Sequence, residues 1–298
     1  MATRKDLMFR PGLADNGKPL IDFRTIPFRA ILRLSKLPPL EVEWDAHDAV
    51  GGLVDNRMFA NDQYGCCVIS SFAHTTLTFE KFEQGVVIPI TDQEVIDEYL
   101  RQSGGRDTGL YITLAMKEWR NTGWTAAGQY HSIYAYASVD PLDHSQVMYS
   151  IQLLNGCYFG MQVYERDIEQ WRNGEPWHLT GNNGAFLGGH AVYAYRYNNL
   201  NMLPTLRSCD GRLNYCSPVP GIWGMTWGTE QFMTWDFWNA RCIQAYAVVD
   251  NKDKWVDNEA VNIPLWESYL KEITGTDPND NPGCSNPKSI IRRFFYGV

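Results

Sequence analysis

The stretch that decides the fold runs from Asn61 to His74, NDQYGCCVISSFAH, with Cys66 and Cys67 at its centre. The residues before the two cysteines favour a turn, since Asn, Asp and Gly tolerate turn backbone conformations. Apolar side chains then recur near helical spacing, at Val68, Phe72, Leu77 and Phe79. We therefore predict a helix that begins at or beside Cys67. A helix N-terminus lowers the pKa of a thiol, which makes Cys67 a candidate nucleophile.

A second segment, GGHAVYAYRY from Gly188 to Tyr197, places an imidazole at the start of an apolar strand. Two glycines before His190 let the backbone approach a neighbouring element closely. A base that faces a cysteine needs this combination of a fixed ring and close packing. His190 lies 190 − 67 = 123 residues after Cys67, and we predict that it is the general base.

These two segments, in this order, resemble the papain-like cysteine peptidases, in particular divergent short-turn chains with an NDQxGxC pattern such as bacterial or phage members. The upstream segment from Leu37 to Gln63 extends the resemblance through a proline, an acidic residue next to Trp44 and a short predicted strand. The resemblance implies an α+β two-lobe fold with a helical first lobe. It also implies a β-rich second lobe with a barrel-like sheet, and a cleft between the lobes that is open to substrate.

In that family a Gln side chain and the backbone N–H of the nucleophile form the oxyanion hole. The Gln usually lies six residues before the cysteine, where this sequence has Asn61, whereas Gln63 lies four residues before Cys67. The resemblance implies Gln63 for this role if the turn is shortened, with Asn61 as the second candidate.

A third segment, GIWGMTWGTEQFMTW from Gly221 to Trp235, is similar to the family's Trp-Gly segment, in which a Trp shields the hydrogen bond between the catalytic His and an Asn. If Trp227 is the shielding residue, Met225 stands at the Asn position; if Trp223 is, Gly221 does. The residue that orients the imidazole is therefore missing or comes from elsewhere. The sequence offers three further candidates for it: Asn182, Asn183 and Asp210.

Cys66 has three interpretations, in decreasing order of preference: a bystander, a resolving thiol that protects Cys67, or the nucleophile itself. The chain has seven cysteines at irregular spacings. This pattern predicts neither a disulfide framework nor a metal site, although Cys209 and Cys216 could pair across a turn.

Composition limits the class of protein. The chain has 298 residues, 44% of them hydrophobic, and a net charge of −8, so it can build a sizeable core and is a poor binder of nucleic acid. We find no apolar run long enough for a signal peptide or a membrane span. We therefore expect a chain that is cytoplasmic as made and has no membrane partner.

The predicted organisation has three parts. Residues 1–37 carry eight basic and three acidic residues and form a basic arm. Residues 38–250 form the papain-like domain, with helices expected from Cys67, at Thr91–Leu100 behind a capping box, and at Gly109–Trp119. Its helical lobe covers about 38–123 and its β lobe about 124–250, where β-forming residues dominate. Residues 251–298 are a C-terminal extension.

The chemistry expected from these residues is acyl transfer from an amide to Cys67 and then to water, with no cofactor and no metal. The substrate would be protein or the peptide of a bacterial cell wall. The alternative is a catalytically impaired papain-like domain that serves as a structural or binding part of an assembly such as a phage particle. Contacts with neighbouring subunits would then be made by residues 1–37 and 290–298.

Overall fold

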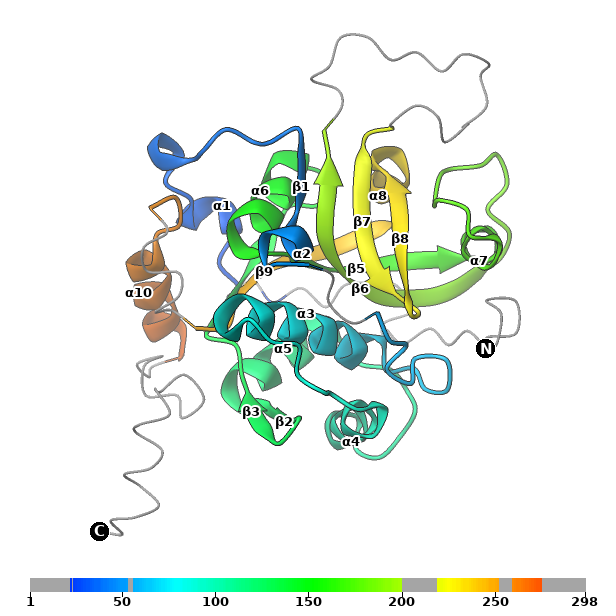
Figure 1. Cartoon of the computed structure of the whole chain (residues 1–298), viewed down its shortest axis with the longest axis horizontal. Coiled ribbons are helices and arrows are strands. Elements are labelled where there is room, and N and C mark those ends of the chain that lie inside the picture. Colours follow the sequence, from blue (N-terminus) through cyan, green and yellow to red (C-terminus); the bar gives the residue numbers. More distant parts are fainter. Residues whose placement is uncertain (1–21, 23, 53–55, 200–218, 252–258, 275–298) are drawn as a thin grey trace.

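The computed structural model describes residues 22, 24–52, 56–199, 219–251 and 259–274, and these residues form an α+β structure (Figure 1). A large antiparallel sheet makes up one part of the molecule. Helix α3 (Cys67–Gln84) lies between this sheet and helix α4 (Asp92–Ser103). All of its residues from Cys67 to Phe79 are buried, as is expected for a helix that is covered on every side.

The sheet has seven strands in the order β4-β9-β5-β6-β7-β8, with β1 paired to the end of β6. All of its strand pairs are antiparallel. The strands are β1 (Glu43–Asp45), β4 (Ala135–Val139), β5 (Cys157–Tyr164), β6 (Phe186–Asn198), β7 (Gly221–Thr226), β8 (Thr229–Thr234) and β9 (Cys242–Val249). Strand β6 is the longest strand and lies in the interior of the sheet, so a side chain on it is held in a fixed position.

The two edges of this sheet do not meet, so the predicted barrel-like sheet is corrected to an open one within the described residues. A short segment covers each edge instead. At β4, the N–H of Ser138 donates to the carbonyl of Ile26 at 2.9 Å. At β8, the backbone of Trp177 bonds Phe232 at 2.8 Å and Thr234 at 3.0 Å. Such segments form hydrogen bonds with the backbone groups of an edge strand and leave the sheet open.

The helical part matches the predictions closely. Helix α3 begins at Cys67, and helix α4 begins with the predicted capping box between Thr91 and Glu94. The third predicted helix is α5 (Ile112–Asn121), which starts three residues later than expected. A hairpin of β2 (Trp124–Ala126) and β3 (Gln129–His131) follows it.

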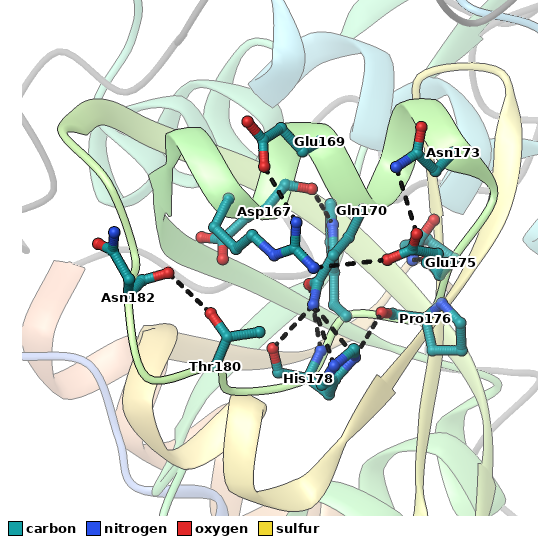
Figure 2. Close-up of polar contacts among 12 residues, drawn as sticks. Asp167, Glu169, Gln170, Asn173, Glu175, Pro176, His178, Thr180 and Asn182 are labelled. Carbon is teal, nitrogen blue, oxygen red and sulfur yellow. Dashed lines mark hydrogen bonds and ion pairs between the residues drawn. The ribbon is translucent and has the colours of Figure 1, made fainter. Parts of the chain in front are cut away.

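Helices also pack on the sheet itself, namely α2 (Ala46–Ala49), α6 (His144–Leu154), α7 (Glu165–Asn173) and α8 (Trp235–Arg241). Helix α7 is fixed by buried polar contacts: Asp167 accepts from Arg241 Nε at 3.0 Å, and the Gln170 amide contacts His178 (Figure 2). Both Asp167 and Gln170 are almost completely buried. The loop after α7 is thus attached to the core before it enters β6.

The described ends of the chain lie together (Figure 1). From the basic arm come α1 (Phe28–Ile31) and the short helix η2 (Leu34–Lys36), and from the C-terminal extension comes α10 (Ile263–Thr274). Lys36 pairs with Glu259 at 2.9 Å, and Leu32 forms a β-bridge with Val261. The described part of the arm therefore packs on the C-terminal extension, and through Ile26 and Ser138 on the edge of the sheet.

Candidate active site

Cys67 occupies the first helical position of α3, where the backbone N–H groups of the first turn have no intrahelical partner. The cap residue, Cys66, makes no side-chain capping bond. Asp107, which lies outside the turn before Cys66, fixes that turn. Its carboxylate accepts hydrogen bonds from the Gly65 N–H and the Tyr99 hydroxyl, both at 2.8 Å. The positive end of the helix dipole therefore acts on Cys67 at a fixed position.

Strand β6 brings His190 to this helix end. The N–H of Ala191 donates to Cys67 Sγ at 3.4 Å, so the sulfur touches the peptide bond that joins His190 to Ala191. Cys67 and His190 are each 1% exposed. The expected open cleft is therefore not seen at this pair, because its surroundings leave almost no surface to solvent.

Thr226 is the side chain that contacts the His190 ring: its Oγ1 lies 2.5 Å from Nε2. The other ring nitrogen, Nδ1, is buried and makes no hydrogen bond within the described residues. Thr226 ends strand β7, so its side chain faces opposite to that of Met225. A side chain at position 225 would therefore point away from the ring, whereas position 226 faces it.

Trp227 stacks on the face of the His190 ring, with ring centroids 4.0 Å apart and an interplanar angle of 19°. It lies in the two-residue turn between β7 and β8, where Trp227 and Gly228 both have positive φ, 43° and 69°. Such turns match the twist of antiparallel strands. The turn thus sets Thr226 and Trp227 against the same ring.

Further aromatic residues hold Trp227 in place. The rings of Trp171 and Trp177 lie edge-on to it, at 5.2 and 5.9 Å. Trp171 Nε1 donates to Thr229 Oγ1 at 3.2 Å, and this hydroxyl donates to the carbonyl of Thr226, also at 3.2 Å. These contacts connect helix α7 to the residues around the imidazole.

Cys66 has a different environment from its neighbour. Its Sγ lies 3.4 Å from the Phe59 carbonyl and from Ser70 Oγ. Burial raises the pKa of its thiol to about 12, and burial does the same for Cys157. A thiol with such a pKa stays protonated and unreactive. The geometry therefore favours the bystander interpretation of Cys66.

The two oxyanion candidates lie in the turn before α3. Asn61 is buried, and its Nδ2 donates to the Tyr64 carbonyl at 3.1 Å. Gln63 has an exposed side chain. The Asn61 amide is thus used to build the turn, while the Gln63 amide faces solvent.

The other predicted residues lie in different places. The carboxamide oxygen of Asn182 accepts from the Gly184 N–H, and that of Asn183 accepts from Arg241. Trp223 packs under Arg196, with the guanidinium 4.4 Å from the ring centroid. None of these contacts involves His190. Asp210, Cys209 and Cys216 lie outside the described residues.

Thr226 is not among the predicted site residues, because the family's Asn position lies two residues before the Trp and Thr226 lies one before Trp227. The signal available in the sequence was Gly228, since glycine favours the positive φ of a tight hairpin turn, and such a turn places Thr226 at the strand end. Asp107 was missed because its partner, Gly65, is 42 residues away in the chain.

Burial lowers the pKa of two histidines, His190 and His47, to about 3. Since the unfolded chain then binds protons that the folded chain does not, stability is complete above pH 6.5 and is lost as the pH falls. We expect each residue to lower the free energy of unfolding by about 1.2 kcal/mol between pH 6 and pH 5. Urea unfolding at both pH values checks this.

The informative variant is His47→Phe, which keeps the ring stack on Tyr195. It should flatten the pH dependence of the unfolding free energy. An equal slope in wild type and His47→Phe would contradict the assignment of His47.

The described residues contain no cluster of three or more His, Cys, Asp or Glu side chains that could hold a metal ion. Across these same ranges, no helix has both the length and the apolar character that crossing a membrane requires.

Comparison with solved structures shows a papain-like fold. Xylellain, a cysteine protease from Xylella fastidiosa, superposes with a TM-score of 0.58 at 13% identity, over 82% of this chain and 99% of that one. The ragweed cysteine protease Amb a 11 in its proform gives 0.51 at 9% identity, over 73% of this chain and 69% of that one. The cysteine protease and lectin-like domains of Cwp84 from Clostridium difficile give 0.50 at 10% identity, over 78% and 55%.

No family model and no curated protein sequence matches the chain. The likeness to the solved structures establishes the two-lobe papain-like fold alone. Assignments of chemistry to individual residues rest on the geometry described above.

Proposed function

We propose that this protein is a cysteine hydrolase that cleaves amide bonds through an acyl-enzyme. The observation that carries the proposal is the setting of His190. Its ring contacts both Thr226 and Trp227, and the N–H of the next residue, Ala191, donates to the sulfur of Cys67 at a helix N-terminus. A fixed imidazole next to such a thiol is the arrangement that nucleophilic catalysis requires.

In the proposed reaction, His190 Nε2–H donates to Thr226, which leaves the lone pair of Nδ1 to take the proton of Cys67. The depressed pKa of His190 keeps its ring neutral before reaction. The thiolate attacks the carbonyl carbon, and the imidazolium returns the proton to the leaving amine. Water then attacks the thioester, with His190 again as the base, and releases the acid.

The oxyanion of each tetrahedral intermediate would be stabilised by the Cys67 N–H and by the side-chain amide of Gln63. Gln63 is preferred to Asn61 because the Asn61 amide is already bonded to Tyr64. Preorganised donors of this kind typically contribute about 10²- to 10³-fold to the rate.

The proposed substrates are proteins or cell-wall peptides, and no cofactor takes part in the steps above. The test is to incubate the full chain with fluorescent casein and with purified cell-wall peptides, and in parallel with iodoacetamide at pH 5.5. Peptide mapping should find Cys67 alkylated before Cys66, Cys157 and Cys242, because burial raises the pKa of these three thiols. Equal or absent labelling of Cys67 would overturn the proposal.

The second candidate function is a structural or binding part of an assembly, such as a phage particle. The observation that favours it is the burial of Cys67 and His190, each only 1% exposed. Residues 1–37 and 290–298 would then hold neighbouring subunits. Absence of both hydrolysis and Cys67 labelling, together with a concentration-dependent oligomer in sedimentation, is the result that selects this candidate.

Thr226→Val is expected to lower kcat/KM by about 10- to 100-fold, because the ring of His190 loses its only fixed polar contact within the described residues. A hydroxyl both donates and accepts, so Thr226→Ser should retain most activity. The pH profile of kcat/KM checks the role, since loss of the hydroxyl also changes the tautomer of the neutral ring. Equal activity of the Val and Ser variants would remove Thr226 from the mechanism.

A further inference from the structure

The turn before helix α3 has a strained backbone. Phe59 and Ala60 both have left-handed φ values, 51° and 58°, and neither is a glycine. No other two adjacent non-glycine residues in the described ranges share a positive φ. In this conformation the Cβ atom comes too close to the carbonyl oxygen, which costs free energy. Such strain persists only where contacts with other parts of the protein impose it.

The strained residues determine the path of the turn that carries Gln63. The carbonyl of Ala60 accepts hydrogen bonds from the N–H groups of Gln63 and Tyr64, both at 3.0 Å. Ala60 is buried, and its left-handed backbone orients the carbonyl toward these two groups. In an ordinary backbone conformation the carbonyl would point elsewhere, and the backbone of Gln63 would lose this bond. The position of Gln63 therefore depends on the strain at Ala60.

Helix α3 fixes the first end of the turn. The carbonyl of Phe59 accepts a hydrogen bond from Ser70 Oγ at 3.1 Å. The Phe59 ring lies edge-on to the ring of His74, with centroids 4.8 Å apart, and Phe59 is completely buried. This end of the turn is thus held by the helix that carries Cys67.

Asp107, between α4 and α5, fixes the second end of the turn. Its Oδ1 accepts from the Gly65 N–H and from the Tyr99 hydroxyl, both at 2.8 Å. The Tyr99 hydroxyl in turn accepts from the Gly109 N–H at 2.9 Å. Hydrogen bonds to a carboxylate are stronger than those to a neutral acceptor. Asp107 is itself exposed, so its replacement removes no core packing.

We propose that Asp107 is a positioning residue for the amide hydrolysis proposed above, on which this inference rests. By holding Gly65, Asp107 keeps the turn in its strained conformation and the Gln63 amide in place for the oxyanion. The role needs an acceptor oxygen at position 107, because both hydrogen bonds converge on one oxygen atom. A carboxamide oxygen can accept both of these bonds.

The test compares Asp107→Ala with Asp107→Asn in the full chain, because both remove the charge and only the second keeps the acceptor. For the labelled substrate that wild type cleaves, Asp107→Ala should lower kcat by about 10- to 100-fold, since a misplaced oxyanion donor destabilises the transition state. KM should change by less than about threefold, because this donor binds the ground state weakly. Asp107→Asn should retain most of kcat.

A readout without substrate follows the turn itself. Amide hydrogen exchange of Gly65 should speed up in Asp107→Ala and stay slow in Asp107→Asn, because only the second keeps the acceptor of this N–H group. Ala60→Gly then tests the strain. Glycine adopts the left-handed conformation without a Cβ clash, so adding Ala60→Gly to Asp107→Ala should raise kcat by at least about threefold.

The background Gln63→Ala tests the route of the effect. If Asp107 acts through Gln63, Asp107→Ala should lower kcat in this background by less than about twofold. For an active wild type, the role of Asp107 is overturned by equal losses in the Ala and Asn variants, by no loss in Asp107→Ala, by no rescue with Ala60→Gly, or by a full loss in the Gln63→Ala background. A wild type that neither hydrolyses substrate nor labels at Cys67 would instead overturn the hydrolase.

Discussion

Cys67→Ala is expected to abolish acyl-enzyme formation and to lower amide hydrolysis by at least about 10⁴-fold, because the reaction loses its nucleophile. The substitution removes one sulfur from a buried position at the start of α3 and leaves the apolar helix intact. Folding should therefore be retained, and the measurement is turnover of labelled casein or cell-wall peptide together with mass spectrometry of the trapped acyl-enzyme.

The matched control is the neighbouring thiol. Cys66→Ala removes a cysteine whose sulfur lies against the Phe59 carbonyl and whose pKa is raised to about 12 by burial. It should keep most of the activity. Full activity of Cys67→Ala with an inactive Cys66→Ala would show that Cys66, and not Cys67, is the nucleophile. Activity in both variants would end the hydrolase proposal.

Local signals predicted the helical part of the fold well. Helix α3 begins at Cys67 because a turn is followed there by helically spaced apolar residues, and α4 begins at its capping box. Both signals lie within a few consecutive residues, so no distant contact is needed to recognise them. The β-rich second half was likewise predictable, since Tyr, Val and other β-forming residues recur in its strands.

The closure of the sheet and the partner of His190 could not be predicted in this way. Whether a sheet closes depends on its edge strands, and here Ile26 and Trp177 cover them from distant parts of the chain. The contact between Thr226 and His190 spans 36 residues. It depends on the alternation of β7 and on a turn at Trp227, so a one-residue error in alignment exchanges the two faces of the strand.

The position of His190 also depends on residues that no catalytic motif contains. Trp177 Nε1 donates to the backbone carbonyl of Asp167 at 2.7 Å, and the Trp177 ring packs on Trp227. Asp167 is in turn bonded to Arg241. Helix α7 and the loop after it (Figure 2) thus connect the buried ion pair, through Trp177 and Trp227, to the ring of His190.

Breaking this ion pair should therefore have the largest effect on stability. Arg241→Met leaves the carboxylate of Asp167 buried without its cation, and we expect a loss of about 3 to 5 kcal/mol in the free energy of unfolding. The control is Arg166→Met on helix α7, the helix of Asp167, where Arg166 pairs at the surface with Glu169 at 3.1 Å and with Glu175 at 3.9 Å. This substitution should cost less than about 1 kcal/mol.

Urea unfolding measures the loss in the free energy of unfolding for both variants. The double variant Arg241→Met with Asp167→Asn shows whether the unpaired charge of Asp167 causes the loss. Neutralising Asp167 removes the unpaired charge, so the double variant should be more stable than Arg241→Met alone. It should also regain activity if the pair acts by positioning Trp177 and through it His190. Equal losses in the Arg241 and Arg166 variants would show that burial of the pair is not what stabilises helix α7.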